Sequence, residues 1–85
     1  MPTIKLYANL RTIAGMKELF ITASSLDGVL NELIEQIPTL DGVILEDGQI
    51  RPHFVITING YNATDLNAVV MEQDNIAIFP PMAGG

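Results

Sequence analysis

The stretch Ser24–Pro38, SSLDGVLNELIEQIP, decides the fold because it predicts the main amphipathic helix of the chain. Its apolar residues recur at spacings of three and four, the period of one helix face; they are Leu26, Val29, Leu30, Leu33, Ile34 and Ile37. Either serine can be the N-cap, since a hydroxyl accepts a bond from a free N–H of the first turn. Pro38 ends the helix near Ile37, because proline lacks an N–H and disfavours helix in the residue before it. We therefore predict one main helix over about residues 25–37.

Segments of alternating apolar and polar residues surround this helix and predict half-buried strands. They are residues 3–8, 18–23, 54–58 and 75–79. We expect the first two to form a hairpin, with residues 9–17 as a plain connection. Asn59-Gly60 predicts a tight turn, and residues 61–73 predict a short helical turn or an irregular segment. One helix over one face of a mixed sheet gives an α+β domain; the pattern leaves the strand order open.

The stretch between the helix and the third strand holds two Asp-Gly turn signals. Between them lie the apolar residues 43–45, which we expect to pack under the end of the sheet.

Length and composition limit the class of protein. The chain has 85 residues, of which 48% are apolar, and this suits one small domain with a core. It has no cysteine, so a disulfide or a thiolate metal site is excluded, and we expect no bound metal. Ten acidic residues against four Lys and Arg, a net charge of -6, disfavour nucleic acid as a partner. No apolar run approaches the ~20 residues that span a bilayer, and no signal peptide is apparent. We therefore expect a cytoplasmic protein that binds neither nucleic acid nor membrane.

Catalytic side chains are scarce. His53 is the only histidine, and we expect it on the surface or in a turn. The only serines are the two at the helix start, and the paired carboxylates Glu46 and Asp47 lie in an EDG turn signal. The sequence therefore predicts no catalytic side chain of its own.

The chain ends in PPMAGG, residues 80–85, directly after the last predicted strand. Pro80 and Pro81 prevent further sheet pairing and stiffen the exit, while the glycines beyond Ala83 have no side chain. Six extended residues reach about 20 Å, so the tail could carry a terminal carboxylate into a narrow site on another protein. The alternative is a frayed terminus, where glycine is common. We divide the chain into a domain, residues 1–79, and a flexible tail, residues 80–85.

Several motifs together resemble the MoaD/ThiS family of ubiquitin-like sulfur carriers. They are YANLRTIAG (7–15), SLDGVLNELIEQIPTL (25–40), EDGQIRP (46–52), FVITING (54–60) and the ending IAIFPPMAGG (76–85). The resemblance implies the β-grasp fold, in which one helix packs across a curled mixed sheet whose first and last strands are neighbours. Two positions depart from the family pattern: Gln73 stands before Asp74 where a glycine is usual, and Gly28 stands where a larger polar residue is usual.

The resemblance also implies a chemistry at the tail. A ubiquitin-activating-like adenylyltransferase would use ATP to adenylate the carboxylate of Gly85, and a sulfur donor would convert it to a thiocarboxylate. The carrier itself would bind no cofactor and would be a non-catalytic subunit. Pro80, Pro81, Met82, Ala83 and Gly84 would form the tail that threads into the partner.

The acceptor that the resemblance implies is the large subunit of molybdopterin synthase, or another sulfur acceptor. The small archaeal modifier proteins carry the same ending, and they imply the alternative that Gly85 is joined to lysines of target proteins. A third alternative is sulfur delivery for cysteine, thiazole or tRNA thiolation.

Phe79, the last residue of the predicted strand, has two interpretations. It alternates with Ile76 and Ile78, so it should lie on the open side of the sheet. There it either contacts a partner beside the tail or forms a small cluster with Val55 and Tyr7. The acidic surplus likewise either steers the chain toward a basic partner or serves solubility.

Overall fold

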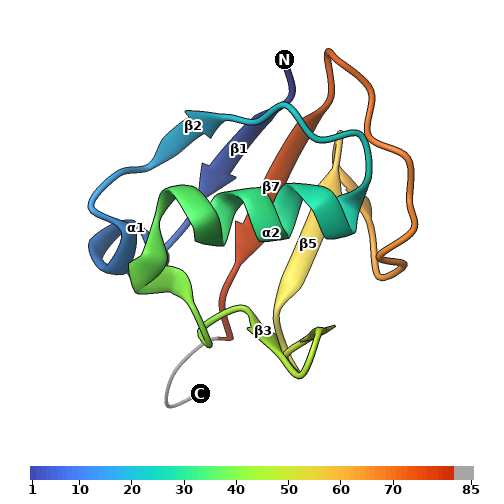
Figure 1. Cartoon of the computed structure of the whole chain (residues 1–85). Helices are drawn as coiled ribbons and strands as arrows, with labels where there is room; N and C mark the ends of the chain where they lie inside the picture. Colours follow the sequence, from blue (N-terminus) through green and yellow to red (C-terminus); the bar gives the residue numbers. More distant parts are fainter. Residues whose placement is uncertain (82–85) are drawn as a thin grey trace.

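One helix lies across one face of a five-stranded sheet in the computed structural model of the chain, which describes residues 1–81 (Figure 1). The strands are β1 (Thr3–Leu6), β2 (Glu18–Phe20), β5 (Val55–Ile58), β6 (Tyr61–Asn62) and β7 (Asn75–Phe79). They lie in the order β2-β1-β7-β5-β6. The pair β1 and β7 is parallel, and the other neighbours are antiparallel. The first and last strands are thus neighbours, as the β-grasp fold requires, and that prediction is confirmed.

Helix α2 (Leu26–Gln36) confirms the main sequence prediction. Ser25 is the N-cap, because its Oγ accepts a bond from the Gly28 N–H at 3.1 Å. The buried face consists of Leu26, Val29, Leu30 and Leu33, each 0% exposed. Burying such a side chain stabilises the fold by about 1.5–3 kcal/mol. The short 3₁₀ helix η1 (Pro38–Leu40) follows where proline ends α2.

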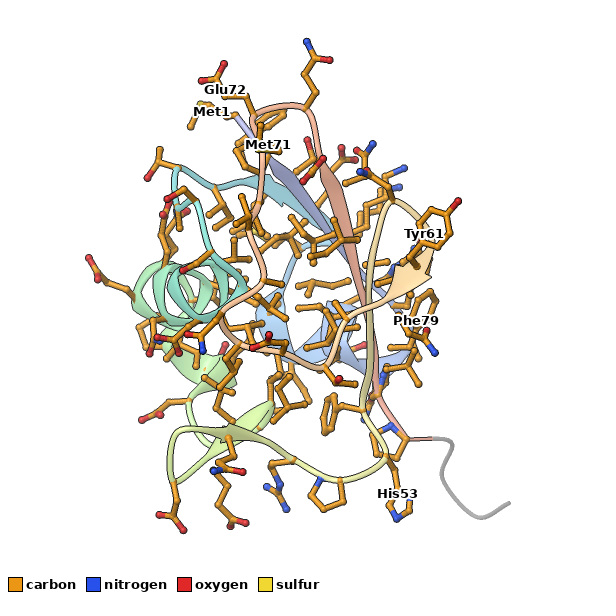
Figure 2. All side chains as sticks on the ribbon, turned by 90° about the vertical axis from the view of Figure 1, so that its right-hand side faces the viewer. Met1, His53, Tyr61, Met71, Glu72 and Phe79 are labelled. Carbon is orange, nitrogen blue, oxygen red and sulfur yellow. The ribbon has the colours of Figure 1, made fainter. Side chains whose placement is uncertain are left out.

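The core fills the space between α2 and the sheet, as the side chains in Figure 2 show. Each predicted strand turns its apolar set inward; the buried members are Ile4, Leu6, Leu19, Ile21, Ile56, Ile76 and Ile78. Ile44 and Leu45 are also buried, as expected. Leu45 belongs to a two-stranded hairpin of β3 (Leu45–Glu46) and β4 (Gln49–Ile50). The alternation therefore predicted correctly which face of each strand is covered.

The prediction that residues 9–17 form a plain connection is wrong. Helix α1 (Asn9–Ala14) lies there, and Gly15 ends it in the left-handed conformation with its N–H bonded to the Arg11 carbonyl. Leu10 is the buried residue of this helix. The helix has only six residues, so its apolar residues Leu10, Ile13 and Ala14 form a stripe of a single turn, too short to stand out in the sequence pattern.

Residues 61–73 match the irregular alternative, apart from β6. The turn Asn59-Gly60, with φ values of 53° and 86°, joins β5 to β6 as predicted. After β6 the chain runs irregularly to β7, with Val70 buried on the way. No helix of residues 1–81 is long and apolar enough to cross a membrane.

The two departures from the family pattern have physical reasons. A Cβ at Gly28 would lie 3.0 Å from the Cβ of Ala23, so the close approach of the chain entering α2 favours glycine. At the other position, Gln73 has no positive φ, so this turn does not require glycine. The carboxylate of Asp74 holds the turn by accepting bonds from the Met71 N–H and from Asn59 Nδ2, each at 2.8 Å.

Candidate functional site

The root of the tail is anchored in the centre of the sheet. Strand β7 pairs with β1 on one side and β5 on the other, and Phe79 stands opposite Val55 in the ladder. Pro80 is half-buried and Pro81 is exposed. A tail that starts from a strand held on both sides has a fixed point of departure.

The other predicted tail residues cannot be placed. Met82, Ala83, Gly84 and Gly85 lie outside the described residues. The roles predicted for them remain predictions.

An aromatic stack, formed by Arg11, Tyr7 and Phe79, lies directly before Pro80. The rings of Tyr7 and Phe79 are stacked with centroids 4.5 Å apart and an angle of 17° between their planes. The guanidinium carbon of Arg11 lies 5.0 Å from the centroid of the Tyr7 ring, within the range of a cation–π contact. Arg11 Nε also donates to the Leu6 carbonyl at 2.7 Å. The stack thus ties helix α1 and the end of β1 to the last residue of β7.

Phe79 is therefore in contact with Tyr7, as one of its two interpretations required. The partner interpretation is still compatible, because Phe79 is only half-buried and Val55, opposite it, is 43% exposed. Figure 2 shows Phe79 on the side of the sheet away from α2. An aromatic surface beside the tail root thus remains available to a second protein.

Arg11 is the residue that the sequence interpretation missed. Its signal is the spacing of Tyr7 and Arg11 in YANLR, four residues apart. That spacing becomes meaningful only when the turn before α1 and the helix itself are known.

A strained turn at Ala8 directs the chain from Tyr7 into α1. Ala8 has φ 54° and ψ -136°, close to the second position of a type II′ turn, where glycine prevails. The Leu10 N–H bonds the Tyr7 carbonyl at 3.2 Å and closes the turn. A non-glycine residue in such a sparsely populated region costs of order 1–3 kcal/mol.

Other polar groups lie apart from the tail root. His53 is exposed with φ 70°, in the turn that the sequence predicted, and Figure 2 shows it pointing away from the sheet. Asp74 precedes β7 at the strand's opposite end, where bonds from the Met71 N–H and the Asn59 side chain lower the pKa of its carboxyl. Within residues 1–81 no three His, Asp or Glu side chains converge as metal ligands.

A β-grasp domain whose central last strand runs into a Gly-Gly tail defines the ubiquitin-like class of proteins. Within that class the chain belongs to the ThiS family, which it matches over residues 4–85. The family resemblance seen in the sequence is thereby confirmed.

Individual relatives agree with this assignment. The chain is 27% identical to small archaeal modifier protein 3 of Haloferax volcanii, over 96% of each chain. It is 29% identical to the molybdopterin synthase sulfur carrier subunit of Arabidopsis thaliana, over 96% of this chain and 80% of that protein. The crystal structure of SAMP1 from Haloferax volcanii superposes with a TM-score of 0.91 at 27% identity, covering 99% of this chain and 98% of that one.

Proposed function

We propose that this protein is a sulfur carrier that works through the carboxylate of Gly85. A carboxylate oxygen attacks the α-phosphorus of ATP in a ubiquitin-activating-like enzyme, and pyrophosphate leaves. Hydrosulfide released by a sulfur donor then attacks the acyl carbon, and AMP and a proton leave. The product is a thiocarboxylate on Gly85.

One observation carries this proposal: the central strand β7 leads without an intervening loop into Pro80-Pro81 and the Gly-Gly ending. A bare carboxylate is a poor electrophile, and adenylation gives it a good leaving group. The activating enzyme binds ATP and supplies the catalytic groups. The carrier therefore supplies only the end of β7 as a fixed base and the Gly-Gly ending as the reactive group.

For the acceptor, we propose the large subunit of molybdopterin synthase. The relative from Arabidopsis thaliana, which is named a molybdopterin synthase sulfur carrier subunit, supports this choice. Because activation consumes ATP, we place the protein in the cytoplasm. We assign the exposed side of Phe79 to contact with the activating enzyme or the acceptor.

Protein modification is the second candidate function. Two relatives from Haloferax volcanii are named small archaeal modifier proteins, 27% and 28% identical to this chain. In this function, the activated Gly85 carbonyl forms an isopeptide bond with the ε-amino group of a target lysine. The adenylation step is the same, so both functions can belong to one protein.

The decisive experiment is intact-protein mass spectrometry after incubation with the cognate activating enzyme, ATP and a sulfur donor. We expect the mass gain that replaces one carboxylate oxygen by sulfur. A chain lacking Gly84 and Gly85 is the matched control and should gain nothing. An unmodified full-length chain, with an enzyme that is active on another carrier, would overturn the proposal. Target peptides joined to Gly85 would instead establish the modifier function.

A further inference from the structure

A pocket opens at the edge of the sheet where the chain after β6 diverges from β5. We call it the edge pocket; its volume is about 330 Å³. Apolar surface from Ile50, Phe54 and Leu66 lines it, together with polar groups of Arg51, Asn62 and Thr64. The volume lies at the low end of the roughly 300–1,000 Å³ of ligand pockets, which suits one large side chain. No member of the aromatic stack lines it, so it is a separate surface.

One backbone carbonyl directly before β5, that of Phe54, faces this opening. Alternate residues of an antiparallel strand bond to opposite neighbours. The Asn59 N–H bonds the Asn75 carbonyl toward β7, and the Ala63 N–H bonds the Ile56 carbonyl on the other side. Ala63 thus stands opposite Ile56 at the end of the ladder, and the Phe54 carbonyl, two residues earlier on the same side, points past it to the opening. Within residues 1–81 no further backbone bond joins β5 to the segment after Ala63.

The charge of the edge pocket is opposite to that of the whole protein. The chain has a net charge of -6, yet none of the described lining residues is acidic and one of them is Arg51. The Arg51 N–H bonds the Ile44 carbonyl and its guanidinium donates to the Gly42 carbonyl, each at 2.8 Å. These bonds hold the side chain in place and use one of the five guanidinium donors. The others remain for a carboxylate.

We propose that the edge pocket docks an extended peptide of a partner protein. One large apolar side chain of the peptide, such as phenylalanine or leucine, inserts between Ile50, Phe54 and Leu66, and a neighbouring carboxylate pairs with Arg51. A backbone N–H of the peptide bonds the Phe54 carbonyl, which extends the edge of the sheet by one contact. An apolar floor, the Phe54 carbonyl and the unused donors of Arg51 together favour an acidic, apolar peptide over other ligands.

This docking goes beyond the proposed function and leaves the tail free. Val55 joins the two surfaces, because it lines the edge pocket and pairs with Phe79. A partner held at the pocket is therefore close to the tail root.

The test is an NMR titration of the ¹⁵N-labelled full-length chain with the blocked peptide acetyl-Gly-Phe-Asp-Gly-amide. We expect saturable shifts of amide signals confined to residues 49–56 and 62–66. Arg51→Glu should weaken binding at least about tenfold, since it replaces attraction by repulsion. Lys17→Glu makes the same charge change at an exposed residue directly before β2, outside the edge pocket, and it should leave the affinity unchanged.

A second variant is needed because Arg51→Glu also removes the bond from the guanidinium to the Gly42 carbonyl. Ala63→Leu fills the pocket without removing a hydrogen bond and should also weaken binding at least about tenfold. Peptides with lysine for aspartate, or alanine for phenylalanine, should bind as weakly. Deleting Gly84 and Gly85 should not change the affinity, so this result is independent of the sulfur chemistry.

Several outcomes would overturn the docking proposal. They are the absence of saturable shifts, shifts confined to the open face of the sheet, or equal weakening by the Arg51 and Lys17 variants. Equal binding of free 3-phenylpropanoate would also overturn it, because the pocket would then be a site for small organic acids.

Discussion

Replacing Ala8 by glycine is expected to stabilise the protein, against the usual effect of glycine. Ala8 has φ 54° and ψ -136°, a conformation that glycine adopts without a steric penalty. The Ala8 side chain is exposed, so its removal leaves no cavity. The substitution therefore isolates backbone strain from packing.

Two opposing contributions set the change in the free energy of unfolding caused by Ala8→Gly. Relief of the strained conformation contributes about 1–3 kcal/mol. Glycine gives the unfolded chain more freedom, and this costs about 0.4–1 kcal/mol. The difference is a net stabilisation between about zero and about 2.6 kcal/mol, with a midpoint of about 1.3 kcal/mol. For a domain of this size ~1 kcal/mol raises Tm by roughly 4–8 °C.

The assay is equilibrium urea unfolding, supported by thermal melting. Ala8→Gly should raise the urea midpoint with an unchanged slope. Ala14→Gly is the matched control, because Ala14 lies in helix α1 with ordinary dihedral angles and should lose about 0.5–1 kcal/mol. If both variants lose stability equally, the turn at Ala8 stores no strain and the reasoning is refuted.

Three further predictions concern the stack, the turn before β7 and the start of α2. Phe79→Ala removes the ring stacked on Tyr7 and should lower the free energy of unfolding by about 0.5–1.5 kcal/mol beyond the effect of the lost buried area. It should also slow adenylation when the carrier concentration is below saturation. Unchanged adenylation kinetics would contradict a contact between Phe79 and the activating enzyme. The pKa of the Asp74 carboxyl is lowered in the folded state, so its stabilising effect is present above its ordinary pKa of 3.8 and is lost as the pH falls below that value. Asp74→Asn should flatten this acid limb of the stability profile, and an identical limb in both proteins would contradict the assignment. Gly28→Ala should destabilise the protein although alanine has the better helix propensity, because the new Cβ lies 3.0 Å from that of Ala23. Adding Ala23→Gly should restore stability. A single Gly28→Ala variant as stable as the parent would show that the backbone moves apart at this contact.

The elements with a repeating pattern could be predicted from the sequence. Helix α2 has an apolar stripe over three turns, and β1, β5 and β7 alternate, so each pattern identifies a buried face. Helix α1 has six residues, and its apolar stripe spans one turn, so it was missed. The central pairing of β1 with β7 joins residues about seventy positions apart, and the local pattern does not encode such a contact.

In the candidate site, too, some features could be predicted from local sequence and others depend on the folded chain. The outward direction of Phe79 followed from local sequence, and the roles of residues 82–85 stay predictions. The contact of Tyr7 with Phe79 was one of two alternatives, and Arg11 was not foreseen. Both contacts depend on the turn at Ala8 and on strand order, which are properties of the folded chain.

The central place of β7 also bears on synthesis. Every other strand precedes β7 in the chain, so the ribosome releases the middle of the sheet last. Until then β1 and β5 lack the neighbour between them, and the halves of the core cannot close. A chain interrupted before β7 would have neither a complete sheet nor a reactive end. If Gly85 is activated as proposed, a chain would present this group only after the strand that completes the sheet has been made.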